Sequence, residues 1–189
     1  ADGPEFNVGE AYTETWARIL NCVLHSHLHT LRSADSKFFD YCYASLQLER
    51  VHSLYRMQKV LDFMGLSYTD IIDKDTGSVE LTKAFYRENT AIFGYYVLGG
   101  VMMSDFIGFM SWCGNHNPGY IRFRNTAANR GALAAWIAQA AERKSLLSTL
   151  RCLSRAPLDG GTDTSMAFMQ STMRMTFIDH ACYAPTDKA

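Results

Sequence analysis

The stretch from Ala91 to Trp112 limits the folds open to this chain more than any other part of the sequence. It reads AIFGYYVLGGVMMSDFIGFMSW, and Asp105 is the only charged residue among its 22. A helix of this length can cross a bilayer, but the stretch contains four glycines and has no sizeable positive cluster beside it. We therefore expect a helix buried at the centre of a helical protein, without membrane contact, or two pieces that break at Gly99–Gly100.

Three further segments repeat apolar residues at the spacing of a helix. The first covers residues 10–31, the second residues 36–64 and the third residues 126–155. On a helical wheel, Arg18 falls on the polar face of the first segment, opposite leucines such as Leu24 and Leu31. Glu49 and His52 fall on the polar side of the second segment. These charged residues are therefore expected to face solvent.

Residues with known capping preferences mark where these helices begin and end. Ser33 or Asp35 is expected to cap the second helix at its N-terminus, and Gly65 is expected to end it. Asn125 or Thr126 is expected to begin the third helix.

These patterns predict an all-α protein, with a bundle of four to five mostly antiparallel helices around the apolar central helix. The first six residues, ADGPEF, resemble the remnant of an expression tag. Residues 7–156 would form the helical domain. Residues 157–189 would form a linker and a short C-terminal segment of uncertain structure, packed on the domain or on a neighbour. Within that segment the spacing of methionines suits both a helix and a strand.

Composition and cysteine usage indicate the class of protein and its compartment. Apolar residues make up 48% of the chain and aromatic residues 13%, which is enough material for a core. The five cysteines are scattered and contain no C-x-x-C pair. A chain of 189 residues with this pattern is expected to keep its thiols reduced, which predicts a cytoplasmic location.

The charge distribution gives the main indication of a partner. Residues 1–119 carry nine basic and 14 acidic residues, whereas residues 120–155 carry seven basic residues and one acidic residue. Tyr120 and Phe123 alternate with the first arginines of this basic segment. Guanidinium groups pair with phosphates, and aromatic rings stack on unpaired bases. The residues expected to contact an anionic partner are Tyr120, Arg122, Phe123, Arg124, Arg130, Lys144, Arg151 and Arg155.

Of the basic residues from Arg130 onward, all except Arg143 would share an arc of about 60° if one helix continued to Arg155. The partner that fits best is RNA or another single-stranded nucleic acid. An acidic protein surface, including that of a second copy, is the alternative. Segments of opposite charge on one chain can also pair head to tail, so a homo-oligomer is expected.

Two sets of residues offer alternative metal-dependent functions. Cys113, His116, His180 and Cys182 supply two thiolates and two imidazoles, which would complete a tetrahedral zinc site. Glu49-x-x-His52 has the spacing found in di-metal helical bundles, but no second pair of this kind occurs in the sequence. Zinc is therefore the only cofactor that we consider.

The sequence thus predicts a non-enzymatic helical binding or assembly domain that contacts an anionic partner. A metal-dependent enzyme or a zinc-stabilised domain is one alternative. A helical pocket that holds a hydrophobic ligand among methionine and aromatic side chains is another.

Overall fold

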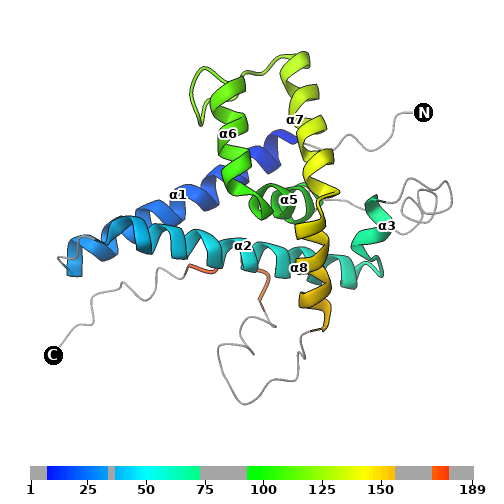
Figure 1. Ribbon diagram of the computed structural model, residues 1–189, viewed down its shortest axis with the longest axis horizontal. Helices are drawn as coiled ribbons and strands as arrows, with labels where there is room; N and C mark the ends of the chain where they lie inside the picture. The colour runs from blue at the N-terminus through cyan, green and yellow to red at the C-terminus, as the bar shows by residue number, and fades with distance from the viewer. Residues whose placement is uncertain (1–7, 34–36, 73–92, 156–171, 179–189) are drawn as a thin grey trace.

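The described part of the chain is entirely helical in its regular structure. The computed structural model describes residues 8–33, 37–72, 93–155 and 172–178. Within these ranges it contains seven α-helices, one π-helical turn and no strand, so the all-α prediction is confirmed (Figure 1). The elements are α1 (Val8–Ser33), α2 (Phe38–Phe63), α3 (Tyr68–Ile72), η1 (Phe93–Leu98), α5 (Gly99–Ser104), α6 (Phe106–His116), α7 (Ala127–Ala141) and α8 (Lys144–Arg155).

Two long helices form the base of the molecule. The helices α1 and α2 run in opposite directions from a shared end, and they pack on each other and on the short helix α5. The helices α6 and α7 stand side by side above them, and α8 crosses α2 (Figure 1). The described residues thus contain more and shorter helices than the four or five predicted, because two predicted long helices are each interrupted.

The described part of the apolar stretch is largely buried, as predicted, although Ile107 is 58% exposed, and it does not break at its paired glycines. Gly99 and Gly100 begin α5, and a Cβ at Gly100 would lie 3.0 Å from the sulfur of Met57 on α2. Glycine therefore permits close packing of α5 on α2 at this point. The break comes instead at Asp105, whose carboxylate accepts a hydrogen bond from the Gly108 amide at 3.1 Å and caps α6.

The two parts of this stretch meet at a sharp angle. Gly94–Ser104 and Phe106–His116 are bent by 93° at Asp105. Among the described helices, none is by itself long and apolar enough to span a membrane, although these two together reach the necessary length and composition.

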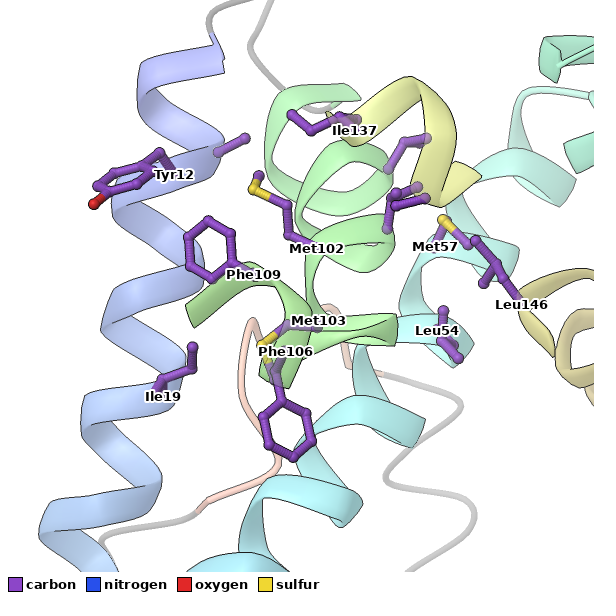
Figure 2. Packing of buried hydrophobic residues seen from close by; sticks show 14 of the residues in the cluster. Tyr12, Ile19, Leu54, Met57, Met102, Met103, Phe106, Phe109, Ile137 and Leu146 are labelled. Atoms are coloured by element: carbon purple, nitrogen blue, oxygen red, sulfur yellow. The ribbon is translucent and has the colours of Figure 1, made fainter. Parts of the chain in front are cut away.

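Side chains from most of the helices fill one hydrophobic core. Met102 and Met103 from α5 and Phe106 and Phe109 from α6 lie at its centre (Figure 2). Around them pack residues from α1, α2, α7 and α8, which include Tyr12, Ile19, Leu54, Met57, Ile137 and Leu146. Three methionines and six aromatic residues of the described ranges are therefore core residues.

The predicted third helix is two helices. The chain turns at Glu142–Arg143, between α7 and α8. Arg143 forms an ion pair with Asp105, and its guanidinium carbon lies 5.8 Å from the centre of the Trp136 ring. These contacts hold the turn against α6 and α7. The prediction of one continuous helix from residue 126 to residue 155 was therefore wrong.

Two of the three predicted helix ends are confirmed. The Thr126 side chain accepts a hydrogen bond from the Asn129 amide at 3.2 Å and caps α7. Gly65 follows α2 with a φ of 69°, which only glycine adopts without strain. The cap proposed before α2 is not found. Lys37 occupies that position without a capping side chain, Ser33 is the last residue of α1, and Asp35 lies outside the described residues.

The predicted faces of α1 are confirmed only in its first half, where the apolar residues Tyr12, Trp16 and Ile19 are buried. Arg18 is buried, with 2% of its surface exposed, whereas Leu24 and Leu31 are 59% and 66% exposed. The physical reason lies in the position of α1. Its second half extends with the start of α2 away from α6, α7 and α8, so no other described helix covers its leucines (Figure 1).

Candidate functional site

The loop between α6 and α7 is fixed from beneath by a buried network of polar side chains. Asn117 donates to the hydroxyl of Tyr12 at 3.1 Å, and its oxygen accepts from the Arg124 amide and from Asn129, each at 3.0 Å. The Tyr12 hydroxyl donates to the carbonyl oxygen of Tyr120 at 2.9 Å. The loop from residue 117 to residue 126 is therefore tied to α1 and α7 at several points.

Aromatic contacts strengthen the attachment of this loop. The half-buried ring of Phe123 lies 4.9 Å from the ring of Tyr12 and 6.5 Å from that of Trp112. Burial raises the pKa of Tyr12 above its usual range, so its hydroxyl remains a neutral hydrogen-bond donor. Phe123 thus anchors the loop to the core. The aromatic side chain that the loop exposes is Tyr120.

The outer surface of the loop displays basic and aromatic side chains. Tyr120 is 61% exposed, and its ring packs over Gly114, where a Cβ would lie only 3.0 Å from the ring. Arg122 and Arg124 are exposed, and neither forms an ion pair with any described residue. Arg130, on the first turn of α7, donates to Asn125 at 2.6 Å. We call this surface the basic loop, defined as Tyr120, Arg122, Arg124 and Arg130.

The remaining predicted contact residues lie apart from the basic loop. Lys144 and Arg151 are exposed on α8, which begins at the far end of α7 from the loop (Figure 1). Arg155 ends α8, but its side chain lies outside the described part of the chain. Because the helix turns at Arg143, the predicted arc of basic residues on one continuous helix does not exist. The loop residues share one loop and the first turn of α7, whereas Lys144 and Arg151 lie on α8 as a second group.

A second cluster of charged residues is buried between α1, α2 and residues 172–178. Glu49 and Arg56 are 0% and 1% exposed, and Arg18 and His52 are buried beside them. We call Arg18, Glu49, His52 and Arg56 the polar cluster, and residues 172–178 the tail segment. The prediction that Glu49 and His52 face solvent was wrong, because the tail segment covers them.

Side chains of the polar cluster bind mainly to the backbone of the tail segment. The Glu49 carboxylate accepts from the Thr176 hydroxyl at 2.7 Å and from the Phe177 amide at 3.2 Å. His52 Nε2 lies 3.0 Å from the carbonyl oxygen of Arg174, and because a carbonyl only accepts, we assign the proton to Nε2. Arg56 donates to the carbonyl oxygen of Thr172.

Burial controls the protonation of the polar cluster. It raises the pKa of Glu49, although Thr176, Phe177 and Arg18 oppose this shift. It lowers the pKa of His52 to about 4, so this imidazole is neutral at pH 7. Arg18 remains within the cluster and donates to Ser53 at 2.8 Å. The cluster is therefore arranged for hydrogen bonding to a peptide backbone.

The sequence of α2 contains a pattern that indicates this cluster, but a helical wheel alone does not show that the pattern is buried. Ser45, Glu49, Ser53 and Arg56 recur at helical spacing directly beside the apolar stripe of α2. A polar stripe of this kind usually faces solvent, unless another segment of the chain covers it. Its partner lies more than 110 residues further along the chain.

The metal sites suggested by the sequence gain no support from the described residues. Glu49 and His52 bind the tail segment and lie beside Arg18 and Arg56, whose positive charges disfavour a cation. His116 stacks on Trp112 with the ring centres 4.4 Å apart, and Cys113 is a buried free thiol. No three His, Cys, Asp or Glu side chains in the described ranges are grouped to hold a metal.

Two of the four predicted zinc ligands lie outside the described residues. They are His180 and Cys182, so the four-ligand site stays a prediction. Burial raises the pKa of Cys113, which disfavours the thiolate that zinc binding requires.

Comparison with known proteins found no relative of this chain. The chain matches no protein-family model, no curated protein and no solved structure.

Proposed function

We propose that this protein is a non-enzymatic helical binding and assembly domain whose basic loop binds RNA or another single-stranded nucleic acid. One observation carries the proposal: Arg122 and Arg124 are exposed on the same loop as the exposed ring of Tyr120 and pair with no acidic side chain in the described ranges. Guanidinium groups bind phosphates, and an exposed ring stacks on an unpaired base.

The fixed backbone of the loop also favours binding. The buried network of Tyr12, Asn117 and Asn129 holds the loop before any partner arrives. A site whose backbone is already ordered loses less conformational entropy on binding than a flexible one. We place the main contact at the basic loop and a secondary contact at Lys144 and Arg151, since α7 separates the two groups.

A titration with labelled oligonucleotides tests this proposal. Fluorescence anisotropy with single-stranded RNA, single-stranded DNA and duplex would be measured at low and moderate salt. We expect the single strands to bind more tightly, with an affinity that falls as salt rises, because binding releases counterions from the phosphates.

Two matched double variants locate the contact. Arg122→Glu with Arg124→Glu and Lys144→Glu with Arg151→Glu change the net charge equally. We expect the loop variant to weaken binding by on the order of 100-fold and the α8 variant by less than about 10-fold, with each phosphate contact worth about 1–2 kcal/mol. Equal losses from the two variants, or binding that ignores salt, would contradict the assignment to the loop.

Tyr120 distinguishes a nucleic acid from an acidic protein surface. Tyr120→Ala removes the stacking ring without a change of charge. We expect a loss of about 1–3 kcal/mol in the free energy of binding to single strands, with an unchanged dependence on salt. Tyr120→Phe serves as the matched control and should keep most of the affinity. If the protein binds none of the oligonucleotides, the anionic partner is not a nucleic acid.

A further inference from the structure

The tail segment is held as a peptide ligand is held, through its backbone. Three of its carbonyl oxygens accept hydrogen bonds from buried or half-buried side chains: Thr172 from Arg56, Met173 from Tyr96 at 2.7 Å and Arg174 from His52 at 3.0 Å. One amide, that of Phe177, donates to Glu49. Such contacts fix a backbone in place whichever chain the segment belongs to.

Side chains of the tail segment add selectivity to this backbone recognition. Thr176 donates to Glu49 and also accepts from Asn21 of α1 at 3.3 Å. Ile178 is buried in the core. A segment with a hydroxyl and, two positions later, an apolar side chain therefore fits this face of α1 and α2 better than an arbitrary peptide.

The polar cluster requires an occupant at this face. Glu49, His52 and Arg56 are buried, and each of them forms a hydrogen bond with the backbone of the tail segment. Without the segment, these three side chains would lose those hydrogen bonds. Buried charged and polar groups that lack partners cost several kcal/mol. Even with the segment in place, Glu49 Oε1 and His52 Nδ1 have no hydrogen-bond partner in the described structure.

Nothing in the recognition of the tail segment depends on its covalent connection to α8. The contacts described above come from α1, α2 and η1, and 16 residues separate Arg155 from Thr172 in the sequence. An extended chain of that length reaches about 55 Å, which exceeds the radius of gyration of about 16 Å expected for a domain of this size. The same contacts can therefore form within one chain or between two chains.

We infer that the face of α1 and α2 formed by Asn21, Glu49, His52 and Arg56 is a binding site for the tail segment of a second copy, through which copies of this chain assemble. The exposed leucines of α1 support a second copy as the occupant. Leu20 and Leu24 lie close to Asn21 on α1 and are 38% and 59% exposed, and apolar surface of this kind is typical of a protein–protein interface. Exchange of an identical segment is a low-cost route to oligomers, because it uses contacts that already exist.

This inference specifies the self-assembly part of the proposed function and does not depend on the nucleic-acid part. Its test uses a cysteine at position 21 on one full-length chain and at position 176 on another, since these two side chains lie 3.3 Å apart. Asn21→Cys would be made in a tagged chain and Thr176→Cys in an untagged chain, both with Cys152→Ser and Cys182→Ser. The two chains are refolded together, oxidised without nucleic acid, and separated on a denaturing gel without reductant.

We expect a disulfide-linked heterodimer whose yield rises with protein concentration. A matched control pairs Asn21→Cys with Ser148→Cys, an exposed position on α8, and should give at least 10-fold less heterodimer. The inference is overturned if no heterodimer forms at any concentration while a chain that carries both Asn21→Cys and Thr176→Cys closes its own disulfide.

A second pair covers the case in which Thr176→Cys disturbs the segment by removing the hydroxyl that binds Glu49. Lys59→Cys on one chain and Met173→Cys on the other leave Thr176 intact, and Lys59 lies 3.3 Å from the carbonyl oxygen of Thr172. A short bis-maleimide would link them between chains if the segment exchanges. The inference is overturned here too if no link forms between the two chains while a chain that carries both substitutions is linked within itself.

Discussion

Arg18 and Arg56 are buried between α1, α2 and the tail segment, whereas Arg122 and Arg124 are exposed on the loop between α6 and α7. The buried pair donates to Ser53 and to carbonyl oxygens of distant segments. The exposed pair contacts no acidic side chain among the described residues. The same type of side chain therefore fulfils two different roles, one in the fold and the other at the surface.

The difference shows how burial changes the consequence of a charge. A buried guanidinium has lost its hydration and needs hydrogen-bond acceptors at fixed positions, so its removal or the removal of its partners destabilises the fold. An exposed guanidinium remains hydrated and contributes little to stability, but it is free to bind an anion. Substitutions in the two regions should therefore separate stability from binding.

The largest expected effect is at Glu49. Glu49→Ala removes the acceptor for Thr176 and Phe177 and a buried negative charge near Arg18, which keeps its ion pair with Glu14. We expect the free energy of unfolding to fall by about 3–5 kcal/mol, as measured by urea denaturation followed by circular dichroism. Arg122→Ala, which removes one exposed charge, is the control. A decrease below about 1 kcal/mol for Glu49→Ala would show that solvent reaches the cluster.

The next effect is a dependence of stability on pH that comes from His52. Burial lowers its pKa to about 4 from an ordinary 6.5, and the neighbouring charges of Arg56 and Arg18 act in the same direction. The unfolded chain therefore binds the proton more tightly, and this contribution to stability is complete above about pH 6.5 and is lost as the pH falls toward 4. The raised pKa of Glu49 acts in the opposite direction, since the stability it provides falls as the pH rises above 4.5.

Comparison with His52→Gln isolates the histidine from Glu49. Glutamine keeps a donor for the carbonyl oxygen of Arg174 but does not titrate. Between pH 7 and pH 4.5 we expect the wild-type protein to lose about 2 kcal/mol more stability than His52→Gln. Urea denaturation of both proteins across this range gives the difference. Parallel curves would mean that His52 is accessible to solvent and protonates without cost.

Tyr12 connects the core to the basic loop, and its substitution should have a smaller effect. Tyr12→Phe keeps the ring in the core but removes the hydroxyl that bonds to the carbonyl of Tyr120 and accepts from Asn117. We expect the free energy of unfolding to fall by about 1–2 kcal/mol and hydrogen exchange at loop amides to become faster, with weaker binding of single strands. Unchanged exchange in the loop would show that Phe123 alone orders it.

Local features of this fold were predictable because they depend on neighbours in the sequence. Thr126 caps α7 through an amide three residues away, and Gly65 ends α2 through its own backbone freedom. Burial of the apolar stretch also follows from composition alone. Its bend at Asp105 was missed because Arg143, 38 residues further along the chain, pairs with that carboxylate.

The burial of the polar cluster was not predictable for a related reason. A helical wheel assigns Arg18 and Glu49 to solvent because it contains no information about what covers a face. The tail segment that covers Glu49 is 127 residues away in the sequence. The basic loop, by contrast, was identified from the alternation of aromatic residues and arginines, since exposure of arginine is the usual case. Its separation from Lys144 and Arg151, and the packing of Phe123 beneath it, required the structure.

The smallest effect on stability is expected where the effect on binding is largest. Arg122→Gln with Arg124→Gln removes two exposed charges that make no ion pair in the described structure. We expect the free energy of unfolding to stay within about 0.5 kcal/mol of the wild-type value. The slope of log affinity against log salt for a single strand should fall by about 1.4, or about 0.7 for each phosphate that is no longer neutralised. Denaturation and anisotropy on the same samples measure both quantities. A decrease in stability with an unchanged slope would place these arginines with the buried pair and remove the distinction between the two regions.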